Sequence, residues 1–450
     1  MLSIENSWAK SVAEMLWPGE QQVTINSKLS QSKVVQHGAN SIFLDITFTP
    51  PEIKSVQRQR ATDMIIVLDR SGSMSEAKKM PFAKAAIGDV LGRLQDNDRF
   101  ALVSFADNAI VQSPLVNVSS GTRHYLNNVV NSIRASGGTN MGDGLNAALS
   151  LLESNQSERV RKILLLSDGQ ANQGITNPEQ LAQLATRATH YGAVLSTIGM
   201  GLGFNETLMA KLADYGMGHY SYLEDLSGLG AILARDLQDT RNIYANSSSL
   251  EIVLSDGVKL IDAGGYPISY INSSTVRIST GQMLSSTNKH FVMTFNVPTG
   301  SMGTVSLGDM HLNYRVQDQQ LQSQVKPEAL KLSIVAPDKH KQARESIDKE
   351  VYQKSWVDNN LGRMKKKLSV WLREGKKDQA QKAIKEYRQE MDEAAVTSQL
   401  PLASPVVEQK LEEMEQQVED AFAGSQLDQQ LKRNRAAKSM QYDSIKTQRK

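Results

Sequence analysis

The sequence predicts a multidomain α/β, β and α fold: a doubly wound, Rossmann-like α/β domain inserted in a β-sandwich and followed by a C-terminal helical bundle. Three observations predict this fold class. Apolar runs alternate with amphipathic segments over 58–243, which is typical of a parallel sheet with helices on both faces. An apolar alternation of period two, typical of half-buried strands, occurs at 20–56 and again at 247–336. From 338 to 450 the composition is charged and rich in Ala and Gln, which favours helices.

Composition restricts the function classes. A chain of 450 residues is long enough for two to four domains, and its net charge of +2 gives no bulk preference for nucleic acid. The absence of cysteine excludes disulfides, thiol catalysis and zinc-thiolate sites. No stretch approaches 18 apolar residues and the first 20 residues lack a secretory signal pattern, so we expect a bacterial cytoplasmic protein without a membrane span.

The first 19 residues have the pattern of an amphipathic helix. Trp8, Val12 and Leu16 recur at helical spacing, and Pro18-Gly19 ends the segment. We therefore predict an N-terminal helix over 1–19.

Two predicted strands follow the N-terminal helix, within 20–56. Two strands do not form a stable sheet alone, and similar strands resume in 247–336. A doubly wound domain that ends on a helix has its termini close together. We therefore predict one sandwich built from both segments, with the α/β domain inserted between them. The alternative is a separate hairpin packed on the α/β domain.

Within 58–243, strands and helices alternate regularly. We expect strands at 63–69, 98–105, 161–167, 193–199 and 218–222, with a short edge strand at 111–115. We expect helices near 76–95, 120–134, 142–153, 178–190, 205–214 and 225–241.

Two of the buried strands end in a carboxylate. Asp69 and Asp168 follow continuous apolar runs, and the carboxyl ends of parallel strands meet at one edge of a sheet. Ser71 and Ser73 alternate with Asp69 in an extended turn, so their side chains can converge, and Thr139 lies on a Gly-Gly-Thr-Asn loop at the same edge. Carboxylates with hydroxyls are hard donors, which suit Mg²⁺, Mn²⁺ or Ca²⁺.

The run Asp69-Arg70-Ser71-Gly72-Ser73, with Thr139 and Asp168 downstream, resembles the metal-ion-dependent adhesion site (MIDAS) of a von Willebrand factor A (VWA) domain. The resemblance covers roughly residues 60–243. It implies that Ser71, Ser73 and Thr139 ligate Mg²⁺, that Asp69 and Asp168 bind directly or through water, and that one position stays vacant for a partner Asp or Glu. Two alternatives are a flavodoxin-like or Rossmann-like domain with polar strand ends by chance, and a VWA fold whose site stays empty.

The donor set favours recognition over catalysis. Hydrolytic Mg²⁺ sites usually gather several carboxylates, whereas here two carboxylates are diluted by three neutral hydroxyls. We therefore expect a non-enzymatic, Mg²⁺-dependent adaptor, with a metal-dependent phosphatase-like enzyme as a weaker alternative. The prokaryotic cytosolic VWA proteins that this chain resembles imply an AAA+ ATPase, or a signalling kinase or phosphatase, as partner. Loops at the same edge supply the candidate partner-binding rim: Asp107, Asn108, Asn140, Gln170, Asn172, Leu202 and Asn205.

The C-terminal segment 338–450 predicts three or four helices and divides by charge. Net charge is +6 over 361–390, −8 over 391–430 and +6 over 431–450. One interpretation is a set of complementary helices with a solvated basic tail. The other is a disordered basic arm, which would make the chain a nucleic-acid-associated scaffold.

Overall fold

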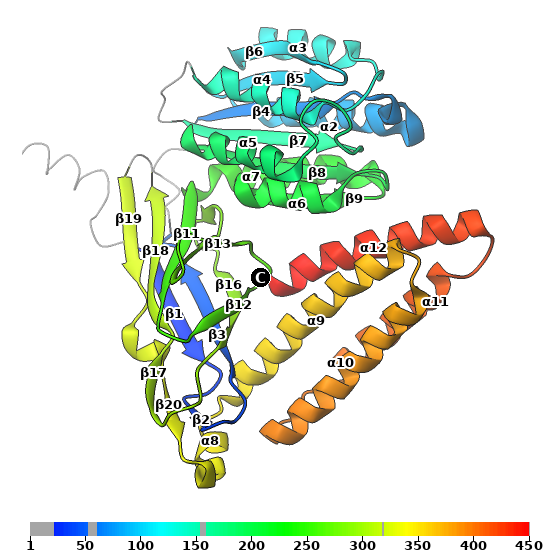
Figure 1. The fold of residues 1–450 in the computed structure, drawn as a ribbon. Helices are drawn as coiled ribbons and strands as arrows, with labels where there is room; N and C mark the ends of the chain where they lie inside the picture. The colour runs from blue at the N-terminus through cyan, green and yellow to red at the C-terminus, as the bar shows by residue number, and fades with distance from the viewer. Residues whose placement is uncertain (1–21, 53–60, 154–158, 317–318, 450) are drawn as a thin grey trace, which may run out of the picture.

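The computed structural model describes residues 22–52, 61–153, 159–316 and 319–449. Three parts are distinguished in Figure 1: an α/β domain, a β-sandwich and a set of long C-terminal helices. The N-terminal segment 1–19, for which we predicted a helix, lies outside the described residues. Within the described residues, no helix combines the length and the apolar character needed to cross a membrane.

The α/β domain is built on a six-stranded sheet with the order β6-β5-β4-β7-β8-β9. Its strands are β4 (Thr62–Asp69), β5 (Arg99–Phe105), β6 (Ala109–Asn117), β7 (Val160–Ser167), β8 (Ala193–Met200) and β9 (Met217–Leu223). Each pairing is parallel except that of β6 with β5. The predicted edge strand at 111–115 is therefore part of a longer antiparallel strand.

Helices cover both faces of this sheet because β4 is apolar on both sides. Ile66 and Leu68 pack under α2 (Lys79–Arg93), α3 (Ser120–Ser132) and α7 (Leu229–Arg241). Ile65 and Val67 pack under α4 (Met141–Glu153), α5 (Pro178–His190) and α6 (Glu206–Tyr215). Two 3₁₀ segments, η1 (Gly72–Lys78) and η2 (Leu226–Gly228), complete the domain. The predicted doubly wound α/β architecture is confirmed.

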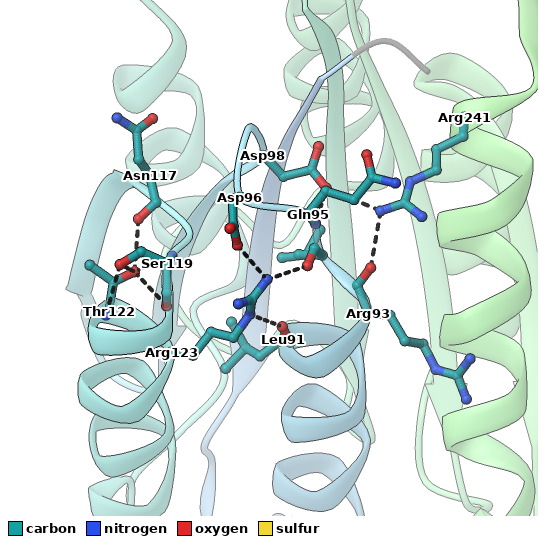
Figure 2. Close-up of polar contacts among 11 residues, drawn as sticks. Leu91, Arg93, Gln95, Asp96, Asp98, Asn117, Ser119, Thr122, Arg123 and Arg241 are labelled. Carbon is teal, nitrogen blue, oxygen red and sulfur yellow. Dashed lines mark hydrogen bonds and ion pairs between the residues drawn. The ribbon is translucent and has the colours of Figure 1, made fainter. Parts of the chain in front are cut away.

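Two arginines connect the helices of one face at the end of α2, as Figure 2 shows. Arg123 of α3 donates to the carbonyl oxygens of Leu91 at 3.2 Å and Leu94 at 2.6 Å. Arg241 of α7 donates to the carbonyl of Arg93 and to Oδ2 of Asp98, both at 3.1 Å. Carbonyls at a helix end lack intrahelical partners, so these side chains satisfy them and hold the three helices together.

The beginning of α2 differs from the prediction of a helix from 76. Glu76 is extended, and Ala77 and Lys78 have left-handed φ angles of 47° and 57°. These three residues close η1 and directly precede α2, which begins at Lys79. No glycine or proline marks the break, so the helical spacing of the sequence could not reveal it.

Strands from both sides of the α/β domain pair with each other in the sandwich. Strand β3 (Ser41–Thr49) pairs antiparallel with β1 (Thr24–Leu29) and with β16 (Lys289–Asn296). The resulting sheet, β1-β3-β16-β12, packs against a five-stranded sheet, β13-β14-β11-β18-β19, around one apolar core. In Figure 1 the first strands of the chain lie beside the green strands that follow the α/β domain.

The other sandwich strands are β2 (Lys33–Val35), β10 (Ile243–Ala245), β11 (Ser247–Leu254), β12 (Lys259–Ala263), β13 (Ile268–Tyr270), β14 (Thr275–Ser279), β15 (Met283–Leu284), β17 (Gly303–Ser306), β18 (Gly308–Val316), β19 (Gln319–Gln324) and β20 (Lys331–Val335). One detail differs from the prediction: the first segment holds three strands rather than two. The additional strand, β2, pairs parallel with β20 in a third sheet. A strand as short as β2 carries too few residues for a periodicity signal.

Five helices follow the sandwich: α8 (His340–Glu345), α9 (Lys349–Arg373), α10 (Lys377–Ser398), α11 (Pro405–Ala421) and α12 (Gln426–Gln448). Two 3₁₀ turns, η3 (Pro327–Leu330) and η4 (Pro337–Lys339), precede α8. Ser404 and Ser425 cap α11 and α12 by accepting backbone N–H groups. Trp356, Leu368 and Ile384 lie in the shared apolar core of these helices.

The basic segment 431–450 is neither a solvated tail nor a disordered arm over its described residues. Almost all of it belongs to α12, which runs between the α/β domain and α9 (Figure 1). Tyr442 of α12 packs edge-on against Tyr220 and Tyr222 of β9. The net charge of the segment could not predict this contact, because the contact is made by aromatic side chains that carry no charge.

Candidate metal centre

The two carboxylates lie where β4 and β7 end, at one edge of the sheet. Asp69 and Asp168 are buried, with 0% and 1% of their surface exposed. Oδ1 of Asp69 accepts the backbone N–H of Ser71 at 2.8 Å, and Oδ2 accepts the hydroxyl of Ser167 at 2.6 Å. Adjacent parallel strands therefore deliver two acidic groups to one place, and hydrogen bonds orient the first.

The two serines join this pair through their hydroxyls. Oγ of Ser71 lies 3.2 Å from Oγ of Ser73, and Oγ of Ser73 donates to Oδ1 of Asp168 at 2.8 Å. The backbone N–H of Gly72 donates to the carbonyl of Gly137 at 3.0 Å. This bond fixes the turn that carries both serines against the loop that carries Thr139.

Thr139 closes the cluster from the other side. It is 3% exposed, and its backbone N–H donates to Oδ1 of Asn172 at 2.9 Å. A β-carbon at Gly169 would stand 3.2 Å from Oγ1 of Thr139 and 3.6 Å from Oδ2 of Asp69. Both oxygens thus border the same small space, which stays open because residue 169 has no side chain.

Burial shifts the pKa of Asp69, the carboxylic acid at the end of β4. Desolvation raises the pKa of Asp69 to about 6, although hydrogen bonds from Ser167 and Ser71 oppose the rise, and the charge of Asp168 adds to it. A buried carboxylate held in this way is stabilised by a nearby cation. Two carboxylate and three hydroxyl groups form a hard-donor set that fits Mg²⁺ or Mn²⁺. Among the described residues, no group of three or more His, Asp or Glu side chains is placed to hold a metal instead.

Two residues of the site were missed by the sequence analysis. Ser167, the last residue of β7, orients Asp69. Lys79, at the first position of α2, places Nζ 2.5 Å from Oδ2 of Asp168 and 3.3 Å from the carbonyl of Ser73. Ser167 could have been noticed as the neighbour of Asp168. Lys79 could not, because its direction depends on the left-handed residues before it.

Several predicted rim residues have structural roles. Oδ1 of Asp107 accepts from the N–H of Gly138 at 2.8 Å and from Gln173 at 2.7 Å. Gly137 has φ of 81°, and a β-carbon there would stand 2.5 Å from Oδ2 of Asp107, so a glycine is required beside this carboxylate. Nδ2 of Asn140 donates to the carbonyl of Asp107 at 3.1 Å.

Of the other rim residues, Asn172 holds Thr139, as described above. The side chain of Asn205 accepts the N–H of Leu208 at 3.0 Å and caps α6. Asn108 and Gln170 are exposed beside the site, and Leu202 is half-buried. The surface left for a partner is therefore smaller than the predicted rim.

Comparison with known proteins identifies the α/β domain. Residues 63–235 match the model of the family described as von Willebrand factor type A domain. The chain is 29% identical over 180 residues to uncharacterized protein YfbK of Escherichia coli, covering 40% of this chain and 31% of that protein. It is 25% identical over 222 residues to uncharacterized protein sll0103 of Synechocystis, covering 49% and 51%. The chain thus spans about a third and about half of these relatives.

The fold of nearly the whole chain has solved counterparts. A structure titled von Willebrand factor type A from Catenulispora acidiphila aligns with 95% of this chain and 98% of its own, with TM-score 0.69 and 16% identity. The ArnB paralog VWA2 from Sulfolobus acidocaldarius aligns with 94% and 99%, with TM-score 0.55 and 16% identity. The α/β domain of this protein, at residues 63–235, is a von Willebrand factor type A domain.

Proposed function

We propose that this protein is a non-enzymatic adaptor whose VWA domain captures an acidic side chain of a partner protein through Mg²⁺. One observation supports the proposal above the others: Asp69, Ser71, Ser73, Thr139 and Asp168 gather around one small space at the edge of the sheet. When bound, the metal would supply a Lewis-acidic centre for a carboxylate from outside.

The charge balance of the ligands supports recognition rather than hydrolysis. The hydroxyls of Ser71, Ser73 and Thr139 are neutral, so two carboxylates leave Mg²⁺ without excess negative charge to repel a third. A carboxylate contact of this kind contributes about 1.5–3 kcal/mol, so the surrounding loops must add specificity.

The partner classes in this proposal are an AAA+ ATPase or a signalling kinase or phosphatase in the cytoplasm. They rest on the resemblance to prokaryotic VWA proteins. The nucleic-acid scaffold is the second candidate, and the contacts of α12 argue against it. Arg435, Lys438 and Arg449 form ion pairs with acidic residues of the VWA domain. These three cations are therefore already neutralised and are not free to bind the phosphates of a nucleic acid.

An affinity pull-down tests the adaptor function. The wild-type chain is compared with Ser71→Ala/Ser73→Ala in Mg²⁺ and in EDTA. Ser132→Ala/Ser150→Ala is the matched control, because both hydroxyls are exposed and bond only to their own helices. We expect the same proteins to be lost with EDTA and with the site variant, and retained by the control. Capture that survives both treatments, or that falls steeply with salt and requires α12, contradicts the proposal.

A further inference from the structure

Lys79 places a cation inside the candidate metal centre. Its side chain is 9% exposed, and Nζ lies 2.5 Å from Oδ2 of Asp168, whose side chain is fully buried. Nζ also donates to the carbonyl of Ser73 at 3.3 Å. The ammonium group of Lys79 therefore already contacts a carboxylate oxygen and a backbone carbonyl oxygen at the candidate metal centre.

The route of the backbone directs this lysine inward. Ala77 and Lys78 both have left-handed φ, and each such non-glycine residue costs about 1–2 kcal/mol. Consecutive left-handed residues are retained only where surrounding contacts compensate. Lys78, one position earlier, is exposed, whereas Lys79 is buried. The turn thus separates two neighbouring lysines, sending one into solvent and the other to Asp168.

Space around Lys79 is also restricted. A β-carbon at Gly201 would stand 3.2 Å from Cε of Lys79, so the loop after β8 lies closely along the lysine stem. Asp168 meanwhile accepts the hydroxyl of Ser73 through its other oxygen, Oδ1. Both oxygens of Asp168 therefore have a hydrogen-bond donor already, and a divalent ion that approaches Oδ2 meets the positive charge of Nζ.

We propose that Lys79 is an intramolecular counter-cation of Asp168 that competes with the divalent ion for the site. The inference rests on the proposed metal site and deepens it. Lys79 stabilises the metal-free VWA domain by neutralising a buried carboxylate. The same contact weakens metal binding, because each ion that binds must first release the ammonium group. Lys79 thereby sets the Mg²⁺ concentration above which the site holds the metal and the adaptor can bind its partner.

The opposite role is that Lys79 simply orients Asp168 for the metal. The two roles make opposite predictions for the neutral variant Lys79→Met. Removing a competitor tightens metal binding, whereas removing an orienting group weakens it. Lys78→Met is the matched control, because it removes the same charge from the adjacent exposed position.

The test is isothermal titration of Mg²⁺ and of Mn²⁺ into the full chain, with thermal melting in EDTA. We expect Lys79→Met to bind both ions about tenfold more tightly or better, and to melt at a lower temperature than wild type in EDTA. Lys78→Met should stay within about twofold of wild type, a free-energy change of about 0.4 kcal/mol. Lys79→Gln replaces Lys79→Met if the latter does not fold.

Unchanged or weaker metal binding by the Lys79 variants, while wild type binds, overturns the inference and leaves the proposed function intact. If neither wild type nor variant binds either ion, the proposed function fails, and the inference fails with it.

Discussion

Nζ of Lys438 lies 2.7 Å from Oε2 of Glu206, and both side chains are almost fully buried between α12 and the VWA domain. The same Nζ donates to the carbonyl of Phe204 at 2.6 Å and stands 4.0 Å from the centre of its ring. Phe204 belongs to the loop after β8, and a β-carbon at Gly203 in that loop would stand 2.8 Å from the carbonyl oxygen of Asp168. The C-terminal helix is thus joined to a loop that borders the metal centre.

Glu206 also pairs with Arg373, so removing Lys438 leaves the buried carboxylate with one of its two counter-charges. Lys438→Met should lower the free energy of unfolding by about 1–3 kcal/mol, the cost of a buried acceptor that loses a partner. Chemical denaturation followed by far-UV circular dichroism measures this change. Lys432→Met, on the exposed face of the same helix, is the control. Equal stability of the two variants would show that the pair does not stabilise the interface.

Arg449 joins three parts of the chain. It binds Asp214 of α6 through two contacts, at 2.5 and 3.0 Å, and donates to the carbonyl of Gly265 in the sandwich at 2.6 Å. Arg449→Lys keeps the charge but loses the two-pronged geometry. We expect faster hydrogen exchange at the 263–268 turn, measured by mass spectrometry. Exchange at that turn indistinguishable from wild type would contradict this role.

Ser167 orients Asp69, so its hydroxyl should matter to both folding and metal binding. Ser167→Ala leaves Oδ2 of Asp69 without its hydrogen-bond donor and should cost about 1–3 kcal/mol of stability in EDTA. Mg²⁺ affinity, measured by titration calorimetry, should fall. Ser150→Ala, which bonds only within α4, serves as the reference. Ser167→Ala that behaves like this reference in both assays would remove Ser167 from the site.

A half-buried lysine of β16, Lys289, predicts a pH effect. Burial, with the nearby charge of Arg449, lowers the pKa of Lys289 to about 7. Between pH 7 and 10.5 the unfolded chain then binds more protons than the folded one. The contribution of Lys289 to the free energy of unfolding therefore increases as the pH rises and decreases as the pH falls. The melting temperature of Lys289→Met should exceed that of wild type most at pH 7, with a difference that shrinks toward pH 9.5. A difference independent of pH would contradict the shifted pKa.

The sequence predicted the VWA domain well because its signals are local. Each apolar run becomes a strand buried on both faces, and Asp69 and Asp168 follow from where β4 and β7 end. The spacing of Ser71 and Ser73, and the resemblance to the metal-ion-dependent adhesion site, predicted that these serines and Thr139 lie close together. These features depend on the chain near each residue and on a well-defined sheet topology.

The remaining features depend on contacts between distant residues. The register that sets Phe48 opposite Lys289 in β3 and β16 is decided by the shared sandwich core, not by either strand. The docking of α12 depends on the contact of Tyr442 with Tyr220, which lies about half of the chain away in the sequence. The direction of Lys79 depends on a left-handed turn that carries no glycine. Periodicity and charge counting contain none of this information.

The central claim is that one hard cation sits among Asp69, Ser71, Ser73, Thr139 and Asp168. The most direct measurement is an anomalous difference map from crystals grown with Mn²⁺ at several times its solution dissociation constant. We predict a single strong peak within about 2.0–2.3 Å of the hydroxyl oxygens of Ser71 and Ser73, with Nζ of Lys79 displaced from Asp168. A map without a peak at this edge of the sheet, with Lys79 still bound to Asp168, would contradict the account.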